Sequence, residues 1–336
     1  MTVPPPTNPD RSLCPGLYDH LVSEELQRVL AEISDPGLFV TSALDPEDSH
    51  AAIAQYVETV LVRLLATVRD GDGRERQRRL ANRLIGALAE ELGKDPTAPM
   101  LLAEPLRRLL ALRDSASSQA GRPDTPLARS ALLTGTRLDP ALGVQLRKEL
   151  ASADRVDILC SFIKWSGLRL LIDDLRRLTA APATDGPRLR VLTTSYMGAT
   201  DPRAVELLRG LPNTEVRVSY DTARTRLHAK AYVFHRKSGF GSAYIGSANL
   251  SKAALSEGLE WTSKISQYEL PHLWAKIVAT FETYWNDDEF EPFTPACKPR
   301  LRSAILRERK GAAVGDDAFV ALDLRPYPFQ EEILEV

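Results

Sequence analysis

The sequence contains few cysteines and no long hydrophobic run. Its three cysteines, Cys14, Cys160 and Cys297, are far apart and form no CxxC pair, which argues against both a zinc site and a disulfide framework. No apolar stretch approaches the roughly 20 residues that a membrane helix needs. The proline-rich N-terminus has neither the basic nor the apolar region of a signal peptide. We therefore expect a cytoplasmic protein without membrane contact.

The chain also lacks a strong net charge. Lys and Arg number 43 and Asp and Glu number 45, so the formal net charge is -2. A polyanion such as nucleic acid would have to be held by a local basic patch, because the overall field is close to neutral. The 43% hydrophobic and 26% charged content is typical of a globular protein.

The length of 336 residues favours more than one domain. Apolar residues recur at helical spacing over Ala51–Val68, Arg79–Leu92 and Met100–Leu112, which predicts a small helical domain over 16–113. A disordered tail over 1–15 precedes this domain. A linker rich in Ser, Gly and Pro is predicted over 114–128.

Strand-like and helix-like segments alternate over 129–296, which predicts an α/β sandwich with both faces of the sheet covered. The remaining residues, 297–336, begin with a basic stretch and end in an amphipathic pattern without a helix stop signal. We interpret them as a basic linker followed by the truncated start of another domain. The predicted strands are 156–163, 189–194, 215–220, one from His228, one entering Gly246, and 260–266, and the predicted helices are 167–178, 202–211, a short one from Ser251, and 271–285.

The most informative residues are His228, Lys230, Ser247, Asn249 and Glu260. In an extended strand, His228 and Lys230 point to the same face. An imidazole is able to attack phosphorus, and an ammonium, a hydroxyl and a carboxamide are able to hold the phosphoryl oxygens. A carboxylate at position 260 would orient an imidazole. This set predicts phosphodiester chemistry that needs neither metal nor cofactor.

The five residues resemble the phospholipase D superfamily motif, HxKx4Dx6GSxN with a downstream glutamate. Two departures occur: His235 stands where the motif has aspartate, and the gap before Gly246 is four residues longer. In the superfamily that aspartate is chiefly structural, so the departures bear on the local loop more than on the chemistry. We interpret His235 as a solvent-edge residue. The resemblance implies a phospholipase D-like fold with a mixed sheet and a phosphohistidine intermediate.

A second resemblance, to the N-terminal nuclease-like region of bacterial DEAD/DEAH-type superfamily-two helicases, covers nearly the whole chain. It implies that Gln330 belongs to an adenine-reading motif and that the helicase core is missing from this chain. No GxxxxGK[ST] loop is present, so ATP hydrolysis is not expected of these residues alone. The segments that carry the resemblance are 16–22, 161–171, 190–201, 218–230, 258–261 and 324–330.

Phospholipase D-type chemistry uses two HxK motifs, each with its own GSxN turn, and this chain has one GSxN turn; its second HxK tripeptide, His235–Lys237, has no GSxN of its own. We therefore predict a homodimer with two His228 side chains in a shared site. Trp165 and Trp261 would either stack on a base or pack in the core. Weaker substrate-binding candidates near the ends of strands are Lys164, Thr193, Thr194, Tyr196 and Arg226.

The predicted function is a DNA endonuclease within a helicase-nuclease, with defence against phage as its setting. Two alternatives stay open. The first is a weak or inactive module that binds DNA and dimerises the helicase. The second is a lipid phosphodiesterase, against which the lack of a membrane-binding basic helix argues.

Overall fold

The computed structural model describes residues 17–47, 49–69, 71–93, 100–112, 121–136, 139–183, 186–221 and 227–315. Arg226 and Gln330 lie outside these residues. The chain divides into two compact units, Met1–Leu112 and Arg113–Val336. In the described part of the chain, no helix has the length and apolar character needed to cross a membrane.

The first unit is helical. It contains α1 (Glu24–Ala31), η1 (Pro36–Leu38), α2 (Ser49–Thr67) and α3 (Gly73–Glu91). Ser23 begins α1 by accepting the amide N–H of Leu26. The helix expected over Met100–Leu112 is wrong, because residues 101–112 are neither helix nor strand. Pro105 explains the error, since proline removes a backbone donor and disfavours helical geometry at the residue before it.

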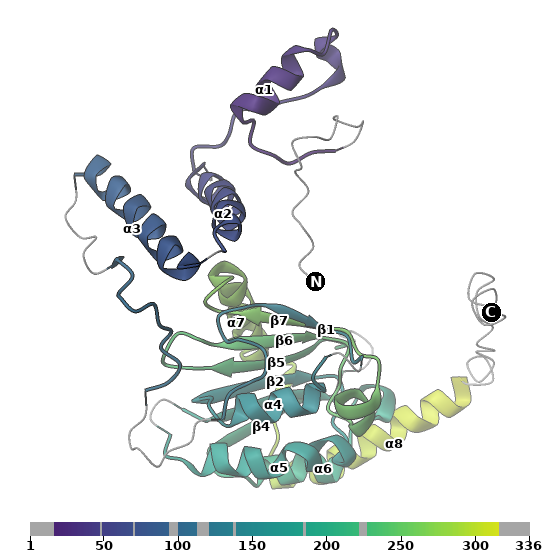
Figure 1. Cartoon of the computed structure of the whole chain (residues 1–336). Coiled ribbons are helices and arrows are strands. Elements are labelled where there is room, and N and C mark those ends of the chain that lie inside the picture. The colour runs from purple at the N-terminus through teal and green to yellow at the C-terminus, as the bar shows by residue number, and fades with distance from the viewer. Residues whose placement is uncertain are drawn as a thin grey trace, which may run out of the picture. The chain divides into compact units, whose positions relative to one another are not determined.

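The second unit is built on an eight-stranded mixed sheet in the order β1-β7-β6-β5-β2-β3-β4-β8. β2, β3 and β4 are parallel, and the remaining neighbours in the sheet are antiparallel. This sheet confirms the predicted α/β class (Figure 1). The strands are β1 (Ala131–Leu133), β2 (Arg155–Cys160), β3 (Leu189–Thr194), β4 (Thr214–Ser219), β5 (Lys230–His235), β6 (Ser242–Gly246), β7 (Thr262–Ser266) and β8 (Phe290–Pro292).

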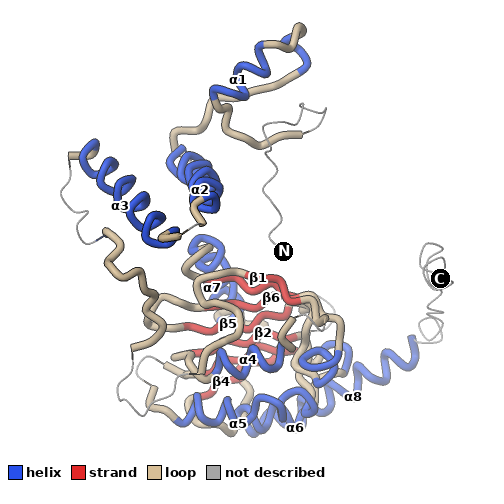
Figure 2. Tube along the Cα trace, in the orientation of Figure 1, coloured by secondary structure: helices blue, strands red, loops and turns tan. Residues whose placement is uncertain are grey.

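Helices cover both faces of the sheet (Figure 2). Val156, Ile158 and Phe234 belong to the larger core, on the face that α4, α5 and α6 cover. Alternate residues such as Leu159 and Val233 point to the opposite face, where they meet α7. The helices are α4 (Leu142–Leu150), α5 (Trp165–Ala180), η3 (Tyr196–Gly198), α6 (Pro202–Arg209), η4 (Ala253–Glu257), α7 (Pro271–Trp285), η5 (Pro295–Cys297) and α8 (Lys298–Gly315).

Two segments outside the predicted sandwich boundaries pack onto it. Lys264, which is fully buried, donates to the carbonyls of Thr125 and Pro126 at 3.2 and 2.8 Å, within the segment read as a linker. In α8, Leu301 and Ile305 are buried in the larger core. The basic stretch after residue 296 therefore begins as a helix of the second unit.

Candidate active site

The five motif residues gather at one end of the central strands of the sheet. β5 begins at Lys230, β6 ends at Gly246, and Gly246 pairs with Thr262 at the start of β7. Because β5 and β7 run antiparallel to β6, this register places the segments before β5, after β6 and before β7 at the same end of the strands. β2 ends there too, since Cys160 pairs with Lys230.

His228 and Lys230 are in direct contact. His228 precedes the strand, although it was expected within it, and it is exposed. The Lys230 Nζ lies 3.0 Å from Nδ1 and 3.1 Å from Nε2 of the imidazole, and it donates to the His228 carbonyl at 2.6 Å. Burial lowers the pKa of Lys230, while the carboxylate of Glu260 acts in the opposite direction. An ammonium is therefore held beside an imidazole that solvent reaches.

Ser247, Asn249 and Glu260 complete the arrangement on the neighbouring segments. The Ser247 hydroxyl donates to the Glu260 carboxylate. The Asn249 Oδ1 accepts the amide N–H of Phe162 at 3.2 Å, which leaves the amide nitrogen as the group available to a ligand. Gly246 is required here, because an added Cβ would lie 2.1 Å from the Trp261 carbonyl oxygen. The turn after β6 is thus held by the Phe162 amide on one side and lies against the Trp261 backbone on the other.

Tyr232 is a supporting residue that the sequence analysis did not single out. Its side chain is buried on the same face of β5 as Lys230, and its hydroxyl donates to the Ala248 carbonyl at 3.1 Å. The Cys160 thiol lies 3.4 Å from that hydroxyl, and burial raises the pKa of the thiol to about 11. Tyr232 therefore connects β5 to the turn that carries Ser247 and Asn249. Its position two residues after Lys230 was the available signal.

The weaker substrate-binding candidates occupy different environments. Lys164 is exposed directly before α5, where its ammonium lies 5.4 Å from the centre of the Phe162 ring. Thr193 and Thr194 are both fully buried. Consecutive strand residues point to opposite faces, so these two threonines do not share a surface. The Thr194 hydroxyl accepts the amide N–H of Tyr196 at 3.0 Å, which fixes the start of η3.

His235 is not the solvent-edge residue that we expected. Its Nε2 lies 2.7 Å from the Asp157 carboxylate, and 18% of its side chain is exposed. Arg190 binds the same carboxylate through two nitrogens at 2.7 and 2.8 Å and also contacts Glu282 of α7. Burial raises the pKa of Asp157, but the hydrogen bonds and charges of Arg190 and His235 outweigh it, so the pKa lies below its ordinary value.

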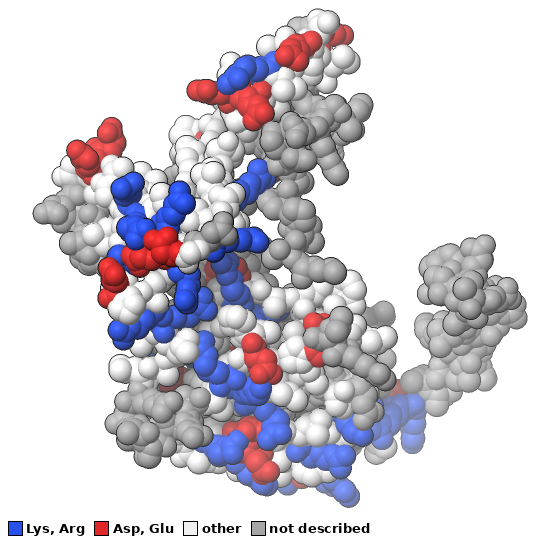
Figure 3. All heavy atoms as spheres, viewed as in Figure 1, with Lys and Arg blue, Asp and Glu red and all other residues white. Residues whose placement is uncertain are grey.

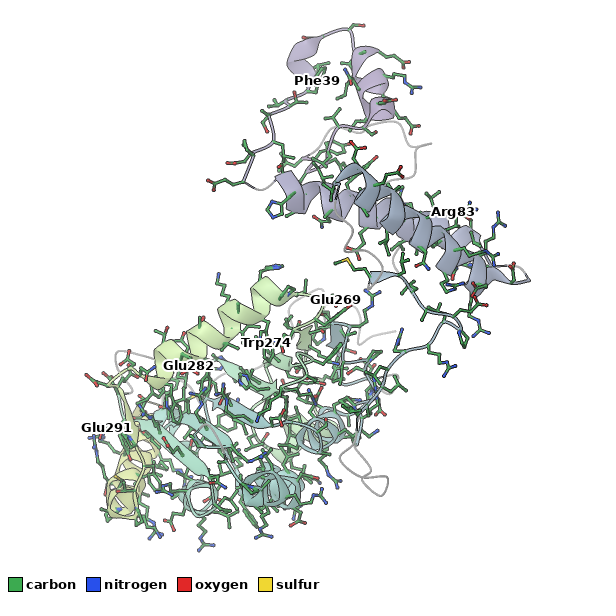
Figure 4. The ribbon with its side chains drawn as sticks, turned by 90° about the vertical axis from the view of Figure 1, so that its left-hand side faces the viewer. Phe39, Arg83, Glu269, Trp274, Glu282 and Glu291 are labelled. Carbon is green, nitrogen blue, oxygen red and sulfur yellow. The ribbon has the colours of Figure 1, made fainter. Side chains whose placement is uncertain are left out.

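His235, which stands where the motif has aspartate, therefore has a carboxylate partner, Asp157, on the neighbouring strand β2. Arg155, Asp157 and His235 lie at the end of β2 and β5 that is remote from His228, since Arg155 pairs with His235 and Cys160 with Lys230. Within the longer gap before Gly246, residues 236–241 form the β5–β6 connection at that remote end. Figure 4 shows Trp274 and Glu282 on α7, the helix that packs on the sheet face to which Leu159 and Val233 point. Neither departure from the motif reaches the residues around His228.

A cleft of about 810 Å³ lies elsewhere in the second unit and does not contain His228. It lies between the end of β4, the start of β8 and α8, and its lining includes Asp221, Asp287, Asp288, Glu289 and Glu291. These five carboxylates outnumber the two guanidinium groups of the lining, Arg300 and Arg307, so the cleft disfavours a phosphodiester. On the face of the second unit that Figure 3 shows, Lys and Arg side chains are interspersed with Asp and Glu. Among the described residues, no group of three or more His, Cys, Asp or Glu is placed to hold a metal ion.

Comparison with known proteins places a family match over this site. Residues 201–272 match the model of the N-terminal phospholipase D domain of the NgoFVII restriction endonuclease, and this range contains all five motif residues. The match supports a phospholipase D-family nuclease or phosphodiesterase domain in the second unit. A search of curated proteins found no match.

Several solved structures are similar to the chain. NucT from Helicobacter pylori is 15% identical, with 49% of this chain and 99% of that chain covered and a TM-score of 0.37. Nuc from Salmonella typhimurium, a phospholipase D family member, is 14% identical over 49% and 99% of the two chains, with a TM-score of 0.34. A polyphosphate kinase from Porphyromonas gingivalis is 17% identical over 56% and 29%, with a TM-score of 0.34.

Proposed function

We propose that the second unit is a metal-independent nuclease that hydrolyses phosphodiester bonds within DNA. The observation that carries the proposal is the meeting of His228, Lys230 and the Ser247–Asn249 turn at one end of β5 and β6. There the imidazole is open to solvent and the ammonium lies 3.0 Å from it. The family match over residues 201–272 supports the same chemistry.

In the proposed reaction, a nitrogen of His228 attacks phosphorus, and the bond from phosphorus to the leaving oxygen breaks. Lys230 and the amide group of Asn249 hold the non-bridging oxygens as charge develops on them. A protonated imidazole from a second copy of the chain donates its proton to the leaving oxygen. Water then attacks the phosphohistidine, breaks the P–N bond and gives its proton to that second imidazole, which restores both residues.

The requirement for two imidazoles leads us to propose a homodimer with a shared site, since this chain has one GSxN turn and its second HxK tripeptide, His235–Lys237, lies at the other end of β5. The natural setting that we propose is a helicase-nuclease acting against phage DNA, with Gln330 at the start of the helicase core.

The first test is cleavage of supercoiled plasmid in the presence of EDTA. We expect the wild type to nick the plasmid and His228→Ala to lose activity by about 10²–10⁴-fold. His272→Ala is the matched control, because His272 is an exposed histidine on α7, outside the site. Tight DNA binding without nicking by the wild type would instead identify an inactive binding module. Loss of nicking in EDTA that Mg²⁺ restores would refute the metal-independent mechanism.

The second test addresses the shared site. Wild type and His228→Ala are co-refolded in varying proportions at constant total concentration. If one site needs both imidazoles, activity follows the square of the wild-type fraction, so an equal mixture retains about a quarter of the activity. Independent sites would retain about half, which would refute the two-imidazole site.

A further inference from the structure

Two tryptophans next to the candidate site are exposed to solvent. Trp165, the first residue of α5, is 45% exposed, and Trp261, directly before β7, is 65% exposed. The other two tryptophans of the chain, Trp274 and Trp285, are 8% and 6% exposed. Large aromatic side chains are usually buried to a high degree, so the packing role considered for Trp165 and Trp261 does not account for them.

The chain segments that carry these tryptophans lie on the two sides of the turn after β6. On one side, the Trp261 carbonyl accepts the amide N–H of Ser247 at 3.2 Å. On the other side, the Lys164 N–H donates to the Leu250 carbonyl at 2.9 Å, and an added Cβ on Gly167 would lie 2.4 Å from the Ser251 nitrogen. The turn with Ser247 and Asn249 is therefore flanked by one exposed indole residue on each side.

This order of groups matches the order of groups in a nucleic acid strand. A phosphodiester always lies between two nucleosides, so a phosphate held at His228 has one base on each side of it. Indole rings bind bases by stacking, and they do so with little regard to sequence because every base has a π-face. A base that stacks on a protein side chain is unstacked and unpaired, which favours single strands over intact duplex.

We propose that Trp165 and Trp261 stack on the two bases that flank the scissile phosphate, and that the substrate is therefore a single strand or an unpaired segment. This inference rests on the proposed function for the position of the phosphate. It adds a class of substrate and two specificity-determining residues, and it predicts little dependence on sequence.

The test is binding, measured in the His228→Ala background so that cleavage does not interfere. The ligands are oligothymidylate, an abasic oligomer of equal length and charge, and an intact duplex. We expect Trp165→Ala and Trp261→Ala each to weaken binding of oligothymidylate by about 5- to 100-fold and to leave the abasic oligomer unchanged. Tyr268→Ala is the matched control, because Tyr268 is 65% exposed but follows the other end of β7.

A second readout uses the indoles themselves. Oligothymidylate should quench the fluorescence of the parent protein, and the quench should disappear in the Trp165→Phe/Trp261→Phe protein, whose remaining indoles are buried. The Phe variants also guard against misfolding, since the signal of Trp274 and Trp285 reports an intact core.

Three results would overturn the inference. These are equal loss of binding to the abasic oligomer, tighter parental binding to duplex than to single strand, and a shift from dimer to monomer in sedimentation. The last result would show that the indoles contact a second copy of the chain. A wild type that binds as expected but cleaves nothing would refute the proposed function and leave the stacking result standing.

Discussion

Replacing His235 with aspartate, the residue that the phospholipase D motif has at this position, should destabilise the protein. The imidazole lies 2.7 Å from a carboxylate of Asp157 that is 1% exposed. Aspartate at position 235 would place a second negative charge on the order of 4 Å away, where like charges repel by roughly 4 kcal/mol at the effective dielectric of a protein. The charge-assisted hydrogen bond of the imidazole would also be lost, at about 1.5–3 kcal/mol.

Arg155 reduces this cost. Its guanidinium lies 3.3 Å from Nε2 of His235 and would pair with the new carboxylate, but its side chain is 33% exposed and the pair is partly screened by solvent. We therefore expect His235→Asp to lower the free energy of unfolding by about 3–5 kcal/mol. His235→Asn, which adds no charge, should lower it by about 1–3 kcal/mol.

Urea unfolding followed by tryptophan fluorescence measures this difference. All four tryptophans belong to the second unit, so the signal reports that unit alone, and the Trp274 ring centre lies 5.5 Å from that of His235. Adding Asp157→Asn to His235→Asp removes the repulsion and should recover part of the loss. A His235→Asp protein as stable as His235→Asn would refute the assignment of His235 as the partner of Asp157.

Two further predictions concern the supporting residues. Tyr232→Phe removes the hydroxyl that donates to the Ala248 carbonyl and leaves that buried acceptor unsatisfied. It should lower the free energy of unfolding by about 1–3 kcal/mol and reduce plasmid nicking, because the turn loosens. Unchanged nicking would contradict the supporting role of Tyr232. Asp157 has a pKa below its ordinary value, so its contribution to stability is present above about pH 4 and is lost as the pH falls through the folded-state pKa. Acid titration should therefore cost the wild type more free energy of unfolding than Asp157→Asn, and equal losses would contradict the assignment.

The parts of the fold that the sequence predicted are those with strong internal patterns. The strand Leu189–Thr194 and the helix Pro271–Trp285 have the bounds that the sequence indicated. β1 and β8 were missed because three-residue edge strands carry no periodicity and exist through their partners. α4 was missed as well, although it supplies buried residues to the larger core.

The candidate site divides in the same way. His228, Lys230 and the turn after β6 are close in sequence, so a local motif is enough to find them. Asp157 lies 78 residues from its partner His235, and only the antiparallel register of β2 against β5 brings them together. A single sequence contains no signal of that register, which is why His235 was assigned to solvent.

β5 therefore has two ends with separate tasks, and this separation can be tested. Its first residue, Lys230, contacts His228, while its last residue, His235, belongs to the charge network with Asp157. Five steps along the strand separate Lys230 from His235 by roughly 17 Å, which is beyond the Debye length of about 8–10 Å at physiological salt. His235→Asp should thus reduce the folded fraction in urea but leave kcat per folded molecule unchanged in its absence. A kcat that falls while the protein is fully folded would show that the two ends are coupled and that position 235 influences catalysis.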